Sequence, residues 1–143
     1  MSFKTEDQVR DEAKSILKFD MEENDIKQGT GQITTFNQLG FKGISNKPDG
    51  WYLPKNINDV AIILETKSED KNISKQIFLD ELLKNIDIIS TKYKNTIGIL
   101  YNGVETTVYK NKEKIEHAKT LQNKQYYIDL FKENYIDKYV RYV

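Results

Sequence analysis

The segment from Val60 to Lys67 constrains the fold of this chain most. It opens with five apolar residues at 60–64, three of them β-branched, and such a run predicts a strand that is covered on both faces. Glu65 and Lys67 follow within the strand period of two, so their side chains project to one face and that of Thr66 to the other. The segment therefore predicts a buried strand that ends in a charged pair.

A second carboxylate precedes another predicted strand. Asp49 follows Pro48, and the polar connection 54–59 would join the strand after it to the strand of Glu65 in a hairpin. A hairpin that brings Asp49 and Glu65 together would make an oxygen site for magnesium, which prefers one or two carboxylates plus water and phosphate. A lysine beside such a site would hold the attacking water or neutralise charge on a phosphate. The simpler alternative is that Asp49 only begins a turn with Gly50.

Pro48-Asp49, fifteen intervening residues and then Glu65-Thr66-Lys67 resemble the signature of the PD-(D/E)XK nuclease superfamily. Residues 5–110 are also similar to the N-terminal nuclease domain of type I restriction endonuclease motor subunits. The further residues that carry this likeness are Glu6 and Arg10 in an opening helix, Ile99 to Gly103, and Thr107 to Tyr109. The resemblance implies an α/β fold with a restriction-endonuclease-like core, in which a mixed central β-sheet is flanked by helices.

The resemblance also implies the roles of individual residues. Asp49 and Glu65 would bind Mg²⁺, or Mn²⁺ as a substitute, together with the main-chain carbonyl of Thr66. Lys67 would assist the attacking water, and Glu6 would complete the metal shell. The chain would then be a magnesium-dependent DNA endonuclease that leaves a 5′-phosphate and a 3′-hydroxyl.

Two of these assignments have an equally simple structural alternative. Glu6 falls within the buried face of its predicted helix, yet it would also serve as a solvated first-turn acid. Gln76 occupies the place of a glutamine that lies near the scissile phosphate in related nucleases, so the resemblance implies that it belongs to the catalytic site and helps to orient it. Several relatives have a tyrosine four residues later, where this chain has Asp80, so a solvent-facing Gln76 is the alternative.

The remaining elements follow from periodicity, caps and turn residues. Strand, helix and strand in succession fit a right-handed crossover, with the strand at 96–101 parallel to that of Glu65. Gly29 and Gly31 suggest a turn or hairpin end, since the lysine and flanking elements of a phosphate loop are missing. The other predicted elements are a helix from Thr5 to about Lys18, short strands at 32–36 and 42–46, a helix capped by Asn72 or Ser74 and ending near Tyr93, a strand from Thr106 to Tyr109, and a helix from about Ala118 to the end.

Composition narrows the class of protein. A length of 143 residues predicts one domain over 1–143, and the absence of cysteine excludes disulfides and thiolate metal sites. The single histidine, His117, lies in a charged stretch and is expected at the surface, so a serine–histidine triad or a histidine metal site is not expected. The sequence has no eighteen-residue apolar run, and its amino terminus carries several charges between Lys4 and Arg10, which predicts a cytoplasmic protein without a membrane partner.

The expected partners are DNA and the motor, specificity or methyltransferase domains or subunits of a restriction–modification complex. The 22 basic residues balance 22 acidic ones, and zero net charge weakens autonomous DNA binding. Two alternatives follow: a non-catalytic DNA- or protein-binding module that keeps the nuclease fold, or a nuclease that cuts only when a partner presents DNA. An aromatic stripe in the last helix predicts packing against the domain, a homodimer contact, or continuation into a larger enzyme; it comprises Tyr127, Phe131, Tyr135 and Tyr139.

Overall fold

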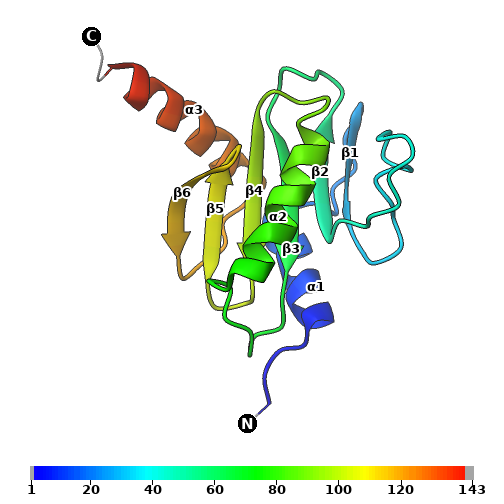
Figure 1. The fold of residues 1–143 in the computed structure, drawn as a ribbon, viewed down its shortest axis with the longest axis vertical. Helices are drawn as coiled ribbons and strands as arrows, with labels where there is room; N and C mark the ends of the chain where they lie inside the picture. Colours follow the sequence, from blue (N-terminus) through cyan, green and yellow to red (C-terminus); the bar gives the residue numbers. More distant parts are fainter. Residues whose placement is uncertain (1, 141–143) are drawn as a thin grey trace.

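A computed structural model describes the backbone of residues 2–140 and the side chains of residues 2–133. Within these residues the chain forms three helices and six strands (Figure 1). In chain order they are α1 (Glu6–Leu17), β1 (Ile26–Thr30), β2 (Gly50–Pro54), β3 (Ala61–Thr66), α2 (Gln76–Ile89), β4 (Thr96–Tyr101), β5 (Thr106–Lys110), β6 (Glu113–Ala118) and α3 (Lys124–Val140). None of the helices in the described part of the chain is long and apolar enough to cross a membrane.

The six strands form one mixed sheet whose spatial order follows the chain order from β1 to β6. Only β3 and β4 run parallel, and every other neighbouring pair is antiparallel. Because α2 lies between β3 and β4 in the chain, it supplies the long connection that a parallel pair needs. The expected α/β class, the mixed sheet and the parallel pairing of 61–66 with 96–101 are confirmed.

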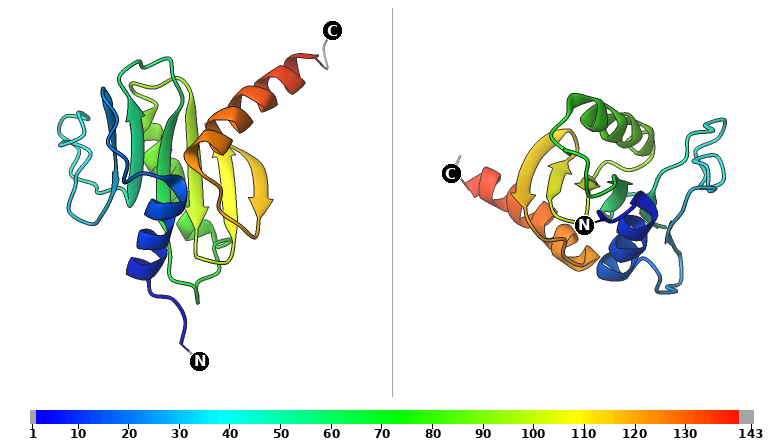
Figure 2. Two further views of the ribbon diagram at one scale, coloured as in Figure 1. Left: turned by 180° about the vertical axis from the view of Figure 1, so that it is seen from behind. Right: turned by 90° about the horizontal axis from the view of Figure 1, so that it is seen from below.

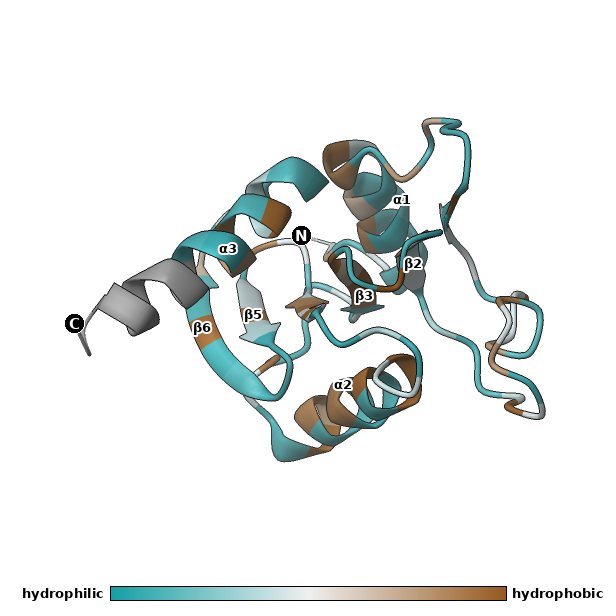
Figure 3. Cartoon of the chain, turned by 90° about the horizontal axis from the view of Figure 1, so that it is seen from above, coloured by the Kyte–Doolittle hydropathy of each residue, from teal (hydrophilic) through white to brown (hydrophobic). Residues whose placement is uncertain are grey.

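Helices cover both faces of the sheet. Figures 2 and 3 show α1 and α3 on one face and α2 on the other, with the strands between them. All residues of β3 and β4 are buried, as expected of central strands with two covered faces.

Each face of the sheet has its own core. The core under α1 and α3 includes Leu17, Ile62, Leu64, Ile99 and Tyr127. The core under α2 includes Trp51, Ile63, Leu82, Ile86 and Leu100. Trp51 and Tyr52 lie on opposite faces of β2, and both are buried because each face is covered.

The opening helix forms as its sequence predicts. Thr5 accepts a hydrogen bond from the backbone N–H of Gln8, and the Gln8 side chain accepts one from the backbone N–H of Thr5, which completes a capping box. Val9, Ala13 and Leu17 are fully buried against the sheet. This packing fixes the direction in which the first turn of α1 approaches the end of β3.

The prediction of strands at 32–36 and 42–46 is wrong. The strand on this side of the sheet is β1, in which Gly29 pairs with Trp51, so Gly29 lies inside a strand and not at a turn. Residues 31–49 form a loop with internal hydrogen bonds, including one from the Phe36 N–H to the Asn46 carbonyl. Phe36 is buried under α2 while Ile33 is 82% exposed, so the apolar residues of this loop do not alternate as a half-buried strand requires.

Two boundaries also differ from expectation. Asn72 and Ser74 do not cap α2: the Asn72 side chain accepts hydrogen bonds from Ser74 in the preceding turn, and the N-cap is Lys75, without a side-chain bond. Residues 113–118 pair with β5 as the edge strand β6, so the last helix begins at Lys124 and not near Ala118. Tyr127 and Phe131 pack into the core, as the modest interpretation of the aromatic stripe expected, whereas Tyr135 and Tyr139 lie outside the described side chains.

Candidate active site

Strand register brings the two predicted carboxylates together. Gly50 pairs with Leu64 in the antiparallel ladder of β2 and β3, so one further step places Asp49 opposite Glu65. Asp49 precedes the ladder, and its side chain turns toward the end of β3. The hairpin therefore places Asp49, Glu65 and Lys67 at the carboxyl end of β3, as the sequence predicts.

Asp49 is held in place by the end of β3. Its Oδ2 accepts hydrogen bonds from the Thr66 backbone N–H at 2.8 Å and from the Thr66 hydroxyl at 3.2 Å. Its side chain is 15% exposed, and its Oδ1 lies 3.7 Å from the buried Nε of Arg10. Asp49 therefore has a fixed orientation, with one oxygen engaged by Thr66 and the other directed toward α1.

Glu65 is buried, and its environment disfavours the charged form. Its Oε1 accepts a hydrogen bond from the Nδ2 of Asn85, itself a buried residue of α2. Burial raises the pKa of Glu65 well above its ordinary value, and the adjacent Asp49 carboxylate raises it further through its charge and a hydrogen bond. Two carboxylates this close favour either a shared proton or a cation.

Lys67 points toward α2. Its Nζ lies 2.6 Å from Glu81 Oε2 and 4.8 Å from the centre of the Phe78 ring. Burial alone would lower the pKa of Lys67, but the hydrogen bond and charge of Glu81 and the charge of Glu65 raise it above its ordinary value. Lys67 is therefore an ammonium at neutral pH, suited to donating hydrogen bonds and compensating negative charge rather than to acting as a base.

The N-terminal part of α1 adds Glu6 and Arg10. Burial raises the pKa of Glu6, and repulsion from Asp49 raises it further. The buried Arg10 side chain bonds Asp7 Oδ1 at 2.7 Å and lies 3.8 Å from Glu6, while its Nε has no hydrogen-bond partner among the described residues. Glu6 thus lies near enough to Asp49 for their charges to repel each other.

The donor set fits a magnesium ion. No group of three or more His, Cys, Asp or Glu side chains in the described part of the chain could hold a metal by itself. Magnesium, however, usually takes only one or two carboxylates and keeps several waters. Asp49, Glu65 and the carbonyl of Thr66 would supply these protein ligands, whereas Glu6 does not form a group of three with the two carboxylates. Burial is the main cause of the raised pKa values of Glu6 and Glu65, and the repulsion from Asp49 that adds to it is the part that a cation would relieve.

Three other polar residues lie apart from this cluster. The Gln76 side chain is exposed and donates its hydrogen bond to Asp80 at 2.8 Å, one turn along α2, as in the solvent-facing interpretation. Glu12 accepts hydrogen bonds from Lys4 and from the Tyr101 hydroxyl, so it is engaged elsewhere. His117 is exposed on β6, as expected.

Glu81 and Asn85 were missed by sequence reasoning. A signal was present for Asn85, because it lies within the helical stripe formed by Leu82, Ile86 and Ile89, where an amide requires a partner. The partner could not be identified, since Glu65 lies twenty residues away in the chain. For Glu81 the sequence offers no signal that separates it from a solvated glutamate.

A small pocket opens beside Glu65 on the side of α2. It has a volume of about 210 Å³ and is lined by Asn46, Lys47, Glu65, Glu81, Lys84 and Asn85. Of its two lysines, Lys47 comes from the loop before Asp49 and Lys84 from α2. Through this pocket Glu65 can be reached from solvent despite its burial.

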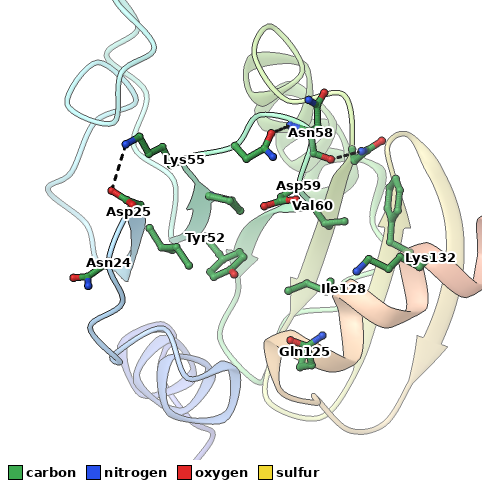
Figure 4. A pocket seen from close by; sticks show the side chains of 15 residues that line it. Asn24, Asp25, Tyr52, Lys55, Asn58, Asp59, Val60, Gln125, Ile128 and Lys132 are labelled. Atoms are coloured by element: carbon green, nitrogen blue, oxygen red, sulfur yellow. Dashed lines mark hydrogen bonds and ion pairs between the residues drawn. The ribbon is translucent and has the colours of Figure 1, made fainter.

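A larger pocket of about 820 Å³ lies away from these residues, where β2 ends and β3 begins, beside α3 (Figure 4). Tyr52, Val60 and Ile128 line it, and Lys55 forms an ion pair with Asp25 at 3.6 Å on its rim. It contains none of the site residues that the sequence predicts. Its size alone assigns no chemistry to it.

The chain was also compared with known proteins. No protein-family model matches it, and neither a curated protein nor a solved structure is detectably similar to it.

Proposed function

We propose that this protein is a magnesium-dependent DNA endonuclease with a restriction-endonuclease-like core, of the kind found in restriction–modification enzymes. The observation that carries the proposal is the convergence of Asp49, Glu65 and Lys67 at one end of β3. The order of an opening helix, three antiparallel strands, a helix and a parallel strand supports the same core.

Each residue has a defined task in the proposed hydrolysis. Asp49, fixed by Thr66, and Glu65, fixed by Asn85, would hold the cation with the Thr66 carbonyl. A bound magnesium ion supplies Lewis-acid stabilisation and a more acidic water. Lys67, as an ammonium, would orient that water or compensate charge on the phosphate while water attacks phosphorus and the bond to the 3′ oxygen breaks. The products would be a 5′-phosphate and a 3′-hydroxyl.

A second candidate is a non-catalytic DNA- or protein-binding module. The ion pair between Lys67 and Glu81 favours it, because both charges are already compensated without a cation or substrate. The crowded carboxylates argue against it, because a purely structural site has no reason to keep Asp49 beside a buried Glu65 whose pKa is raised. Metal binding separates the two candidates.

The test is titration of Mg²⁺ or Mn²⁺ into the wild type, followed by incubation with supercoiled DNA. We expect the wild type to bind metal and nick DNA and Asp49→Ala to lose both. Lys67→Ala should bind metal but cleave about a hundredfold more slowly, the order of effect seen when one electrostatic donor is removed from an active site. Because Glu81 is half exposed, loss of its ion pair should cost at most about 1 kcal/mol of stability.

Lys112→Ala is the matched control. Lys112 also pairs with a carboxylate of α2, Asp87 at 2.5 Å, but lies away from the site. Its cleavage rate should equal that of the wild type. Metal binding without cleavage would indicate a nuclease that needs a motor or specificity partner to present DNA, whereas no metal binding would leave the binding module. Full activity in Lys67→Ala would refute the role given to the lysine.

A further inference from the structure

Two polar side chains of α2 contact the two charged side chains at the end of β3, Glu65 and Lys67, and the spacing along the helix matches the spacing along the strand. Glu81 contacts Lys67 and Asn85 contacts Glu65. Residues four apart rise about 6 Å along a helix, and residues two apart advance about 6.6 Å along a strand. Because these lengths agree, one face of the helix reaches both side chains at once. We call Glu81 and Asn85 the α2 clamp.

We propose that the α2 clamp positions the reactive groups: Asn85 orients the Glu65 carboxylate for the cation, and Glu81 holds the Lys67 ammonium beside it. This inference rests on the proposed function of the site. Neither clamp residue would touch the reacting atoms, so both are positioning residues and not catalytic ones.

The burial of Asn85 supports its role. It is 7% exposed among the apolar residues of α2, where a leucine would pack without the cost of desolvating an amide. Its donor goes to one oxygen of Glu65, which is 6% exposed. Hydrogen bonds to metal ligands from such outer residues fix the ligand's orientation and tune its affinity for the metal.

Glu81 acts on a more flexible group. A lysine side chain has several rotatable bonds, and holding its ammonium in one place requires contacts that offset the lost freedom. Lys67 has two such contacts, the Glu81 carboxylate at 2.6 Å and the Phe78 ring at 4.8 Å. Without Glu81 the ammonium would occupy the productive position for a smaller fraction of the time.

The test compares Mn²⁺ affinity, measured by calorimetry on the full chain, in the wild type, Asn85→Leu and Gln76→Ala. We expect Asn85→Leu to fold and to bind Mn²⁺ about 10–100-fold more weakly, the usual effect of removing such an outer hydrogen bond. Gln76→Ala removes an exposed polar side chain of the same helix and should bind like the wild type. Thermal unfolding verifies that each variant is folded, and Asn85→Ser is the second variant if leucine prevents folding.

The outcomes separate this inference from the proposed function. Wild-type affinity in a folded Asn85 variant would overturn the clamp and leave the metal site standing. Absence of Mn²⁺ binding in the wild type itself would overturn both. Glu81→Gln should lower kcat of DNA cleavage by about 10–100-fold, a typical cost of misplaced groups, with KM and Mn²⁺ affinity unchanged. A higher kcat would show that Glu81 restrains Lys67 instead of positioning it, and would refute its half of the clamp.

Discussion

At the scale of single residues, burial and neighbouring groups shift the pKa values of the carboxyl groups in and near the site. Glu6 and Glu65 both have raised pKa values, first because burial disfavours their charge and then because of Asp49. Glu12, on the same helix as Glu6, has the opposite shift: burial would raise its pKa, but hydrogen bonds from Lys4 and Tyr101 lower it below its ordinary value. The raised pKa of Glu65 and the lowered pKa of Glu12 predict opposite changes in stability as pH rises.

Without metal, Glu65→Gln should be more stable than the wild type at neutral pH. A raised pKa means that the folded state holds a proton that the unfolded state has released, so stability falls as pH rises from the ordinary value toward the raised one. The glutamine variant lacks this loss. Thermal unfolding in EDTA across pH 4 to 9 should show its advantage appear as pH rises above about 4.5, an ordinary glutamate pKa.

Glu12→Gln is the control with the opposite sign. Its lowered pKa means that its charge stabilises the fold above the ordinary pKa, so the variant should be less stable than the wild type at neutral pH. A Glu65→Gln protein that is destabilised at every pH would show that hydrogen bonding outweighs charge burial at Glu65.

At the scale of elements, the sequence predicted those whose pattern is strong locally. Thr5 with the spacing of Val9, Ala13 and Leu17 was sufficient for α1, and the apolar run before Glu65 was sufficient for β3. The edge strands β1 and β6 were missed because their residues are mostly polar and only partly buried. These two strands form because they pair with β2 and β5. Tertiary pairing of this kind leaves little trace in local sequence.

The same distinction applies to the site. Asp49, Glu65 and Lys67 could be predicted because one hairpin joins them, and hairpin register follows from the chain. Asn85 and Glu81 could not, because their contacts depend on how α2 packs across β3. That packing is close at Gly98 of β4, where an added Cβ would lie 2.5 Å from Ile86 Cδ1.

Gly98→Ala should therefore destabilise the protein by about 1–3 kcal/mol, the usual cost of overpacking a core. Ile86→Val removes the methyl group that the new Cβ would meet, so the double variant should be more stable than the sum of the single effects predicts. Urea denaturation measures both. Gly31→Ala, with no atom within 4 Å of the added Cβ, is the control, and an equal loss there would contradict the packing argument.

At the scale of the whole molecule, the proposed site lies at the end of β3 where the first turn of α1 meets the sheet, and α3 extends from the sheet beside β5 and β6 (Figures 1 and 2). Charge is balanced over the chain, with 22 basic and 22 acidic residues. Within the site the cations are already paired, Arg10 with Asp7 and Lys67 with Glu81. The proposed DNA binding would therefore depend on local charge, such as that of Lys47 and Lys84 at the small pocket.

The zero net charge predicts that the chain alone binds DNA weakly and that its affinity depends little on salt. Non-specific affinity comes from neutralising phosphates, so a net charge of zero implies a Kd of about 10 µM or weaker near 0.15 M salt, and a small slope of log Kd against log salt. Fluorescence anisotropy of a labelled duplex, with Ca²⁺ in place of Mg²⁺ to suppress cleavage, measures both. Submicromolar binding at that salt would contradict the argument and indicate a basic surface sufficient for autonomous action. Weak binding together with metal-dependent nicking would mean that the site is competent and that delivery of DNA to it falls to a partner.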